Sequence, residues 1–251
     1  MHKEKEAHQS RPLKVGDRFN VLVERMATGG AGIAKHKKLV VFVPLACPDD
    51  ELLVEVTRVK KSYVDAKIIE IIKPSVSRRS FYCSIANTCG GCQWQQIEYT
   101  QQLKQKKSLL LESLQRHGKL TNLPNINLIE CDREFHYRNR VRLHWNGKIL
   151  GFFTAKSHQL IRVDSCPLAE PSLNSQVPII LDWLKNNKIK KDADIDLFLD
   201  SNNLPQFKLK KTKNETFPFS QVNSLINKKL ISYVLEKANE KYQWPLNLFS
   251  R

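Results

Sequence analysis

The chain has 251 residues and carries 41 Lys and Arg against 25 Asp and Glu, a formal net charge of +16 that indicates a polyanionic partner, most often nucleic acid. Its length suits two or more modest domains, and no apolar run is long enough to span a bilayer. Residues 1–11 lack the apolar stretch of a signal peptide, so we expect a cytoplasmic protein without membrane contact.

The first organised region runs from about Leu13 to Lys73 and reads as short β-strands. Alternating or continuous apolar residues occur in four runs, residues 19–23, 38–45, 52–56 and 64–72. Turn residues separate the runs, at Gly29–Gly32 and again at Pro48–Asp50. Short strands joined in this way favour a small closed barrel of the oligonucleotide-binding kind. The cations on its loops bind nucleic acid or merely form a solvated surface: Lys35, His36, Lys37, Lys38, Arg58, Lys60 and Lys61.

Next come three closely spaced cysteines, Cys83, Cys89 and Cys92, and a fourth, Cys166, follows much later, directly before a proline. A cubane iron–sulfur cluster takes four thiolates, commonly three from one loop and one from elsewhere. The spacing therefore favours a cluster. A zinc site and a pair of redox thiols stay open as alternatives, although the chain lacks the second Cys-x-x-Cys or His pair typical of zinc ribbons.

Glycines stand inside this cysteine segment, at Gly90 and Gly91. A chain that wraps around inorganic sulfur needs room for its backbone, so we expect positive φ angles and close backbone approach there. The two remaining cysteines, Cys47 and Cys131, stand alone and are interpreted as ordinary buried thiols.

A single amphipathic helix is predicted after the cysteine segment. Apolar residues recur at helical spacing from Tyr99 to Leu114, and Gly118 is placed to act as the C′ residue of the helix. From Ile126 to about Leu209 the pattern turns back to strands. In residues 135–145 alternation places four cationic or potentially cationic side chains on one face: Arg138, Arg140, Arg142 and His144. Such a row is either a solvated face or an RNA-binding one, and we favour RNA because the side chains repel one another unless an anion compensates them.

The last region begins at Phe217 and continues into a predicted helix with apolar positions from Val222 to Ala238. Residues 244–249 read as the start of a buried strand. In a doubly wound fold the loop after such a strand holds a nucleotide-type cofactor, and the sequence stops at Arg251 before that loop. We therefore expect the front part of a longer protein.

Several motifs together resemble a known family, the RNA uracil-5-methyltransferases that carry an iron–sulfur cluster and an N-terminal TRAM domain. Among them the chain is most similar to the bacterial 23S ribosomal RNA (uracil-5-)-methyltransferases of the RlmD type. The resemblance covers almost the whole chain and rests on the barrel, the cysteine segment with Gln95–Tyr99 and Gln102–Lys104, Tyr137–Val141, Leu150–Phe152, Cys166-Pro167 and Phe219–Asn223.

The resemblance implies two cofactors. Cys83, Cys89, Cys92 and Cys166 would hold a structural [4Fe-4S] cluster, and Gln221 and Phe249 would contact S-adenosylmethionine. The chain departs from the family pattern at three positions near its end, where Asn247, Ser250 and Arg251 replace Asp, Cys and Gly.

In the family a cysteine thiolate adds to C6 of uracil, C5 takes the methyl group, and a carboxylate removes the C5 proton. The resemblance places that nucleophile, the carboxylate and the glycine-rich cofactor loop beyond the last residue of this sequence. No catalytic residue is therefore assigned, and we expect the chain to be inactive alone. The alternative is a truncated, non-catalytic RNA-binding module with a cluster. The partner is 23S ribosomal RNA, and no obligate protein partner is inferred.

The expected fold class is multidomain α+β. A basic polar tail covers residues 1–12 and a five-stranded, OB-like TRAM barrel covers 13–73. The iron–sulfur loop, the helix and a β-rich RNA-binding domain cover 74–215. Residues 216–251 would supply only the first elements of a Rossmann-like methyltransferase domain.

Overall fold

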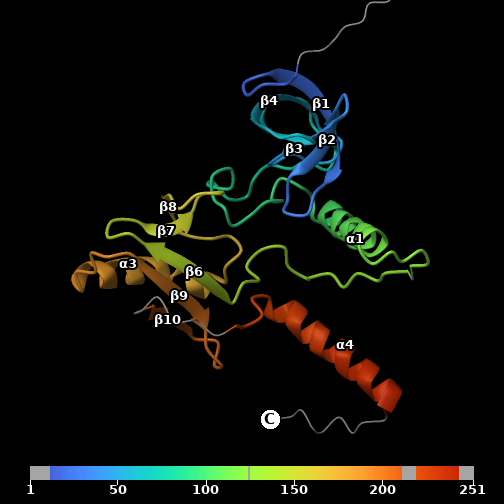
Figure 1. The fold of residues 1–251 in the computed structure, drawn as a ribbon. Coiled ribbons are helices and arrows are strands. Elements are labelled where there is room, and N and C mark those ends of the chain that lie inside the picture. The colour runs from blue at the N-terminus through green and yellow to red at the C-terminus, as the bar shows by residue number, and fades with distance from the viewer. Residues whose placement is uncertain (1–11, 124, 211–218, 243–251) are drawn as a thin grey trace, which may run out of the picture. The chain divides into compact units, whose positions relative to one another are not determined.

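The structure is a computed structural model that describes residues 12–123, 125–210 and 219–242 (Figure 1). The chain divides into two compact units. The first comprises residues 1–80 and 93–124, and the second comprises 81–92 and 125–251. The sequence analysis grouped residues 93–124 with the central domain, whereas the structure groups them with the barrel.

The first unit contains a closed five-stranded barrel with the strand order β1-β2-β3-β5-β4. Neighbouring strands are antiparallel except β3 and β5, which are parallel. The bounds of the strands are β1 Arg18–Met26, β2 Gly32–His36, β3 Leu39–Val43, β4 Glu51–Val59 and β5 Tyr63–Lys73. The predicted barrel is thus confirmed.

Small apolar side chains fill the barrel because alternate residues of each strand point inward. Val23, Val41, Val54 and Val64 are completely buried. The apolar runs did not reveal β2, which begins at Gly32 within the predicted turn. A Cβ at Gly32 would lie 2.8 Å from the Cβ of Ala46, so this strand position packs closely against the chain.

Helix α1, Tyr99–Arg116, belongs to the first unit and is held against the end of β1. The side chain of Gln105 accepts a hydrogen bond from the backbone N–H of Met26 at 3.0 Å, and Arg25 pairs with Glu112 at 3.1 Å. The predicted helix is therefore confirmed. Gly118 directly follows the C-cap His117 and so occupies the predicted C′ position, while the residue with a left-handed backbone is Lys119, at φ 51°.

The second unit is built on a five-stranded sheet with the order β10-β9-β6-β7-β8. Its strands are β6 Arg140–Trp145, β7 Leu150–Phe153, β8 Leu160–Arg162, β9 Ala193–Leu199 and β10 Pro205–Leu209. All of its paired strands are antiparallel. Strand β6 starts later than the predicted run 135–145, because residues before Arg140 bond to the loop after Cys166 instead.

Two helices that the strand prediction missed lie between β8 and β9, α2 at Pro171–Asn174 and α3 at Gln176–Asn186. Helix α3 packs on the sheet, because Val177, Ile180 and Leu184 share one buried cluster with β6 and β9 residues. These three residues are spaced at helical intervals, which was the available sequence signal.

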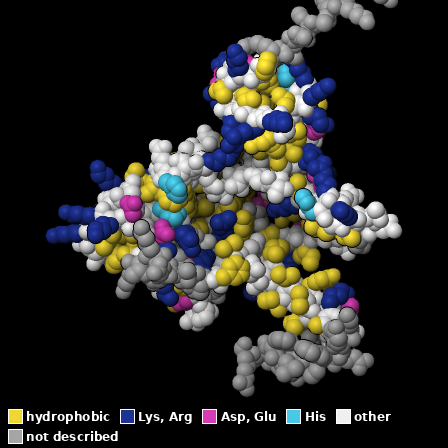
Figure 2. All heavy atoms as spheres, in the orientation of Figure 1, with side chains coloured by type: hydrophobic (Ala, Val, Ile, Leu, Met, Phe, Trp, Pro, Cys, Tyr) yellow, Lys and Arg dark blue, Asp and Glu magenta, His cyan; other side chains and the backbone are white. Residues whose placement is uncertain are grey.

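Helix α4, Ser224–Tyr242, follows the predicted helix closely. Many of its apolar side chains are exposed, including Leu230, Ile231 and Val234, and Figure 2 shows hydrophobic side chains gathered along it. In the part of the chain that the structure describes, no helix combines the length and apolarity needed to cross a membrane.

Candidate functional site

The four cysteines of the predicted cluster all lie in the second unit. Cys83, Cys89 and Cys92 come from the loop before residue 93, and Cys166 comes from the loop after β8. All four are partly buried. Burial raises the pKa of the Cys92 thiol to about 11, and the nearby Cys166, Cys89 and Cys83 raise it further. The fold thus brings the four thiols within electrostatic range of one another.

The loop that carries three of these cysteines is fixed to the end of β7 by backbone contacts. The N–H of Gly90 donates to the carbonyl of Phe153 at 3.0 Å, and the N–H of Ala155 donates to Thr88 at 3.1 Å. Cys89 also forms an isolated antiparallel bridge with Thr154. The cysteine loop, otherwise built of turns, is therefore joined to the end of β7 by one isolated bridge and its flanking hydrogen bonds.

The two glycines of this loop serve close approach rather than unusual backbone angles. A Cβ at Gly90 would lie 3.1 Å from the carbonyl oxygen of Phe153, and a Cβ at Gly91 would lie 3.5 Å from Cys89 Sγ. The backbone N–H of Gly91 donates to that sulfur at 3.4 Å. The expected positive φ is wrong at both positions. Close backbone approach is found at Gly90, whereas the 3.5 Å contact at Gly91 is an ordinary van der Waals contact.

The fourth cysteine is held by the end of α2. The backbone N–H of Cys166 donates to Asn174 Oδ1 at 2.8 Å, and Asn174 Nδ2 donates back to the carbonyl of Cys166 at 3.0 Å. This reciprocal pair fixes the backbone that carries the thiol. The sequence analysis did not identify Asn174.

The four thiols can be compared with what different metal groups require of their ligands. Among the described residues no group of three or more His, Cys, Asp or Glu is placed to share one metal ion. A tetrahedral zinc site needs sulfur atoms about 3.8 Å apart, given a Zn–S bond of about 2.3 Å. A cubane cluster binds each thiolate at a different iron and tolerates a wider set. Four thiols are the donor set that such a cluster takes.

Arg138 is a charged neighbour of these cysteines. Burial raises the pKa of the Cys89 thiol, and the Arg138 guanidinium acts in the opposite direction on both Cys89 and Cys92. The Nε of Arg138 is buried and has no hydrogen-bond partner within the described ranges. Arg138 precedes β6, so it is not part of the strand face on which the sequence analysis placed it.

The alternation within β6 itself is confirmed, because Val141, Leu143 and Trp145 are buried. On the other face, Arg140 forms a nearly buried ion pair with Asp196 of β9, with Nε and Oδ1 2.7 Å apart. His144 Nδ1 lies 2.7 Å from Asp194 Oδ1. Arg140 and His144 are therefore each paired with a carboxylate of the neighbouring strand, while the side chain of Arg142 is exposed.

The segment that contains Gln221 is tied to the start of β6. Asn139 donates from its backbone N–H to Val222 at 2.9 Å and from its side chain to the carbonyl of Gln221 at 3.2 Å. Asn223 then caps α4 by accepting a hydrogen bond from the N–H of Ile226 at 3.0 Å. The side chain of Gln221 is exposed. Phe249, the other predicted cofactor contact, lies outside the described residues.

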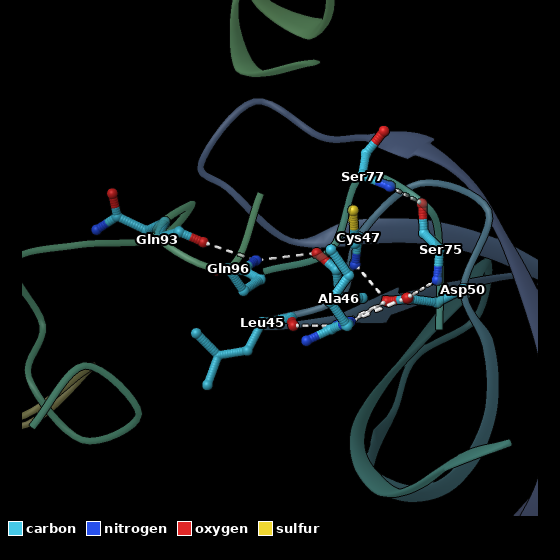
Figure 3. Close-up of polar contacts among 9 residues, drawn as sticks. Leu45, Ala46, Cys47, Asp50, Ser75, Ser77, Gln93 and Gln96 are labelled. Atoms are coloured by element: carbon cyan, nitrogen blue, oxygen red, sulfur yellow. Dashed lines mark hydrogen bonds and ion pairs between the residues drawn. The ribbon is translucent and has the colours of Figure 1, made fainter. Parts of the chain in front are cut away.

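Cys47 has a different environment, inside the first unit. Figure 3 shows it beside Asp50, which accepts hydrogen bonds from the backbone N–H groups of Cys47 at 2.6 Å and Ser75 at 3.0 Å. Asp50 also forms a buried ion pair with Arg78. Burial raises the pKa of the Cys47 thiol to about 11. Its interpretation as a buried thiol is confirmed, and it is unsuited to act as a nucleophile.

Comparison with known proteins shows that part of the first unit matches a known domain family. Residues 12–69 match the TRAM domain. The whole chain is also similar to RNA methyltransferases. It is 31% identical over 226 residues to an uncharacterised RNA methyltransferase of Bdellovibrio bacteriovorus, and the match covers 90% of this chain and 58% of that protein. An uncharacterised RNA methyltransferase of Aquifex aeolicus is 34% identical over 188 residues, 75% of this chain and 43% of the relative.

A solved structure shares the fold. The Pyrococcus abyssi tRNA (uracil-54, C5)-methyltransferase in complex with S-adenosyl-L-homocysteine aligns with a TM-score of 0.63 at 17% identity, over 86% of this chain and 64% of that one. The chain therefore contains a TRAM domain and is a relative of RNA methyltransferases. It spans about half the length of the curated relatives that it matches.

Proposed function

We propose that this chain is the RNA-binding and cluster-bearing part of an S-adenosylmethionine-dependent RNA uracil-C5 methyltransferase that acts on 23S ribosomal RNA in the cytoplasm. The observation that carries the proposal is the gathering of Cys83, Cys89, Cys92 and Cys166 in one unit of a chain similar to RNA methyltransferases. The fold neighbour is a tRNA (uracil-54, C5)-methyltransferase, which supports the choice of base.

These four cysteines would bind a [4Fe-4S] cluster as their resident group. The bound cluster would cross-link the loop of residues 81–92 to the loop after β8. Gly91 and Asn174 would support the ligands, the first by its N–H bond to Cys89 Sγ and the second by holding the Cys166 backbone. Its proposed role is structural.

RNA binding is supported by one end of the barrel. Strands β3 and β5 are parallel with Val40 opposite Tyr63, so the turns that precede these residues lie at the same end. Both turns carry exposed lysines: Lys37, Lys38, Lys60 and Lys61. Tyr63 and Phe42 form an edge-to-face pair beside them. Lysines next to aromatic rings suit a single-stranded RNA.

In the second unit, fewer arginines are proposed to contact RNA than the sequence pattern indicated. Arg142 is exposed and is proposed to contact phosphate, whereas Arg140 has its charge balanced by Asp196. Arg138 was predicted to bind RNA as well, and its position beside Cys89 and Cys92 suggests another role.

S-adenosylmethionine is proposed to contact Gln221 and Phe249. The exposed Gln221 side chain stands on backbone that Asn139 fixes, which supports a ligand-contacting position. We assign no catalytic residue. Four of the chain's cysteines are the proposed cluster ligands, Cys47 is buried with a raised pKa, and Cys131 Sγ lies 3.3 Å from Asn223 Nδ2.

A second candidate is a non-catalytic RNA-binding module that carries a cluster. The placement of the cysteines favours it for the chain by itself, because none is an accessible thiol beside the Gln221 side chain. Both candidate functions include the cluster and RNA binding. Only the first includes methyl transfer.

The test of the cluster is metal content. Anaerobically purified protein should be brown and contain about four iron and four sulfide per chain. Cys166→Ser should make the cluster labile, while Cys131→Ser should leave the iron content unchanged. Stoichiometric zinc in a colourless anaerobic preparation would overturn the cluster.

The test of RNA binding is its dependence on salt. Replacing the four turn lysines at positions 37, 38, 60 and 61 by Ala should flatten the plot of log affinity against log salt by about 0.7 per lysine lost. The matched control replaces four exposed lysines in the last turn of α3 and just after it, at positions 185, 188, 190 and 191. Equal slopes for both variants would mean that the barrel end is only a solvated surface.

A further inference from the structure

Arg138 has a buried hydrogen-bond donor that finds no acceptor within residues 12–123, 125–210 and 219–242. Its Nε is inaccessible to solvent and has no partner among the residues that the structure describes. Buried donors in native structures are nearly always paired, so an unpaired one points to a group that the polypeptide itself does not supply. A guanidinium favours an anionic acceptor.

The backbone places Arg138 beside the loop of the fourth cysteine. Its N–H donates to the carbonyl of Leu168 at 2.8 Å, and its own carbonyl accepts from the N–H of Glu170 at 2.9 Å. Two residues earlier, the N–H of His136 donates to the carbonyl of Pro167 at 2.9 Å. Residues 136–138 therefore run along the loop that begins at Cys166.

The guanidinium of Arg138 is also close enough to two of these cysteines to act on them electrostatically. Burial raises the pKa of the thiols of Cys89 and Cys92, and Arg138 opposes this effect at both. The nearest arginine in the sequence, Arg140, behaves differently, because its guanidinium is held by Asp196 and by Ser220 Oγ. Arg138 is thus the cation placed to compensate negative charge that develops at the cysteine site.

We propose that Arg138 donates its Nε–H to a sulfur of the cluster held by Cys83, Cys89, Cys92 and Cys166, and that it raises the reduction potential of that cluster. The proposal rests on the cluster of the proposed function. Four thiolates on a [4Fe-4S] core of charge 2+ give a net charge of 2−, and one-electron reduction makes it 3−. A fixed cation and a hydrogen bond stabilise the more negative state. Arg138 is therefore a positioning and tuning residue rather than an RNA contact.

The experiment is a redox titration of the anaerobically reconstituted full chain, in which dithionite supplies the electron and the paramagnetic signal of the reduced cluster is followed. At a fixed potential Arg138→Gln should lower the ratio of reduced to oxidised cluster by roughly tenfold, a shift of about 59 mV for one electron. Arg138→Lys, which keeps the charge but loses the Nε donor, should give an intermediate ratio. The matched control is Arg133→Gln, which removes an exposed cation from the same segment and should leave the ratio unchanged.

The outcomes separate this inference from the proposed function. A parent chain that binds no iron and sulfide overturns the cluster itself. A loaded parent whose potential equals that of Arg138→Lys and Arg138→Gln overturns the role of Arg138 alone. If Arg138→Gln does not retain a cluster, the comparison of parent with Arg138→Lys decides: a lower potential in the variant supports the hydrogen bond, and equal potentials refute it.

Discussion

At the residue scale, the cysteines differ in their surroundings, and these surroundings determine how readily each thiol loses its proton. Cys47 is completely buried beside Asp50 in the barrel unit, while Cys89 and Cys92 are partly buried among other thiols and near Arg138. Burial alone keeps a thiol neutral, since it penalises the thiolate. A metal cluster reverses that preference, because its iron atoms bind only the deprotonated sulfur.

Cys47 predicts a pH dependence of stability. Its pKa of about 11 in the folded chain lies above the ordinary value of 9.0, mainly because it is buried. The unfolded chain therefore loses this proton first, so the contribution of Cys47 is present below about pH 9 and is lost as pH rises toward 11. Over that window urea unfolding should show the parent losing roughly 2–3 kcal/mol more stability than Cys47→Ala. Parallel losses in the two proteins would contradict the prediction.

At the element scale, the turn between β1 and β2 is fitted to a segment far away in the sequence. Trp94 Nε1 donates to the carbonyl of Gly30 at 3.2 Å, and Gln96 Nε2 donates to Ala46 at 3.0 Å. Ile97 is buried with Met26 and Cys47. Residues 94–97 thus belong structurally to the barrel unit although they follow the cysteine loop directly in sequence.

Two neighbouring glycines in this turn give a matched test. Gly29 and Gly30 have φ of 97° and 94°, so Ala strains the backbone at either position, by about 1–2 kcal/mol. A Cβ at Gly30 would also lie 2.4 Å from Gln93 Cβ, whereas a Cβ at Gly29 meets nothing within 4 Å. Gly30→Ala should therefore lower the melting temperature clearly more than Gly29→Ala. Equal decreases in melting temperature would show that the turn shifts to accommodate the added Cβ at position 30.

Helix α4 has an apolar face that is exposed in the described structure. Ile231 is 50% and Val234 is 55% exposed, so replacing both by Gln removes little buried surface. Because exposed apolar faces promote association, the double variant should sediment with less self-association than the parent and unfold at the same temperature. The control is Val177→Gln in α3, which places an amide in the core and should destabilise the second unit. Unchanged association in the double variant would contradict this view of α4.

At the scale of the whole molecule, charge and cofactor chemistry are divided among the parts of the chain. The net charge of +16 suits RNA, and the proposed binding surface is the set of exposed lysines at one end of the barrel. The cysteine site lies in the other unit, together with the segment that carries Gln221. Methyl transfer needs a nucleophile, a methyl donor and a proton acceptor held at reacting distance.

The placement of the cysteines predicts that this chain forms no 5-methyluridine by itself. Purified protein would be incubated with methyl-labelled S-adenosylmethionine and unmodified ribosomal RNA, and the RNA digested to nucleosides. We expect no labelled 5-methyluridine above a control without protein, while an active RNA uracil-C5 methyltransferase in a parallel reaction gives the labelled nucleoside. Labelled product from the chain would mean that one of its own cysteines acts as the nucleophile.

The sequence by itself determined the local pattern of this protein. Alternation predicted β1, β3, β4 and β5, and helical spacing predicted α1 and α4, because these patterns depend only on which residues face a core. It also singled out Cys83, Cys89, Cys92 and Cys166. It missed β2, α2 and α3, and it gave Gly90 and Gly91 left-handed angles that they do not have.

Only the tertiary structure decided which charges have partners. Asp196 neutralises Arg140 because β9 pairs with β6, and no local pattern shows which strands pair. Arg138 lies near the cysteines because residues 136–138 bond to the loop after Cys166, a contact between positions about thirty residues apart. Pairing across such separations is set by the packing of the whole unit, so sequence reasoning read all of these arginines as one surface.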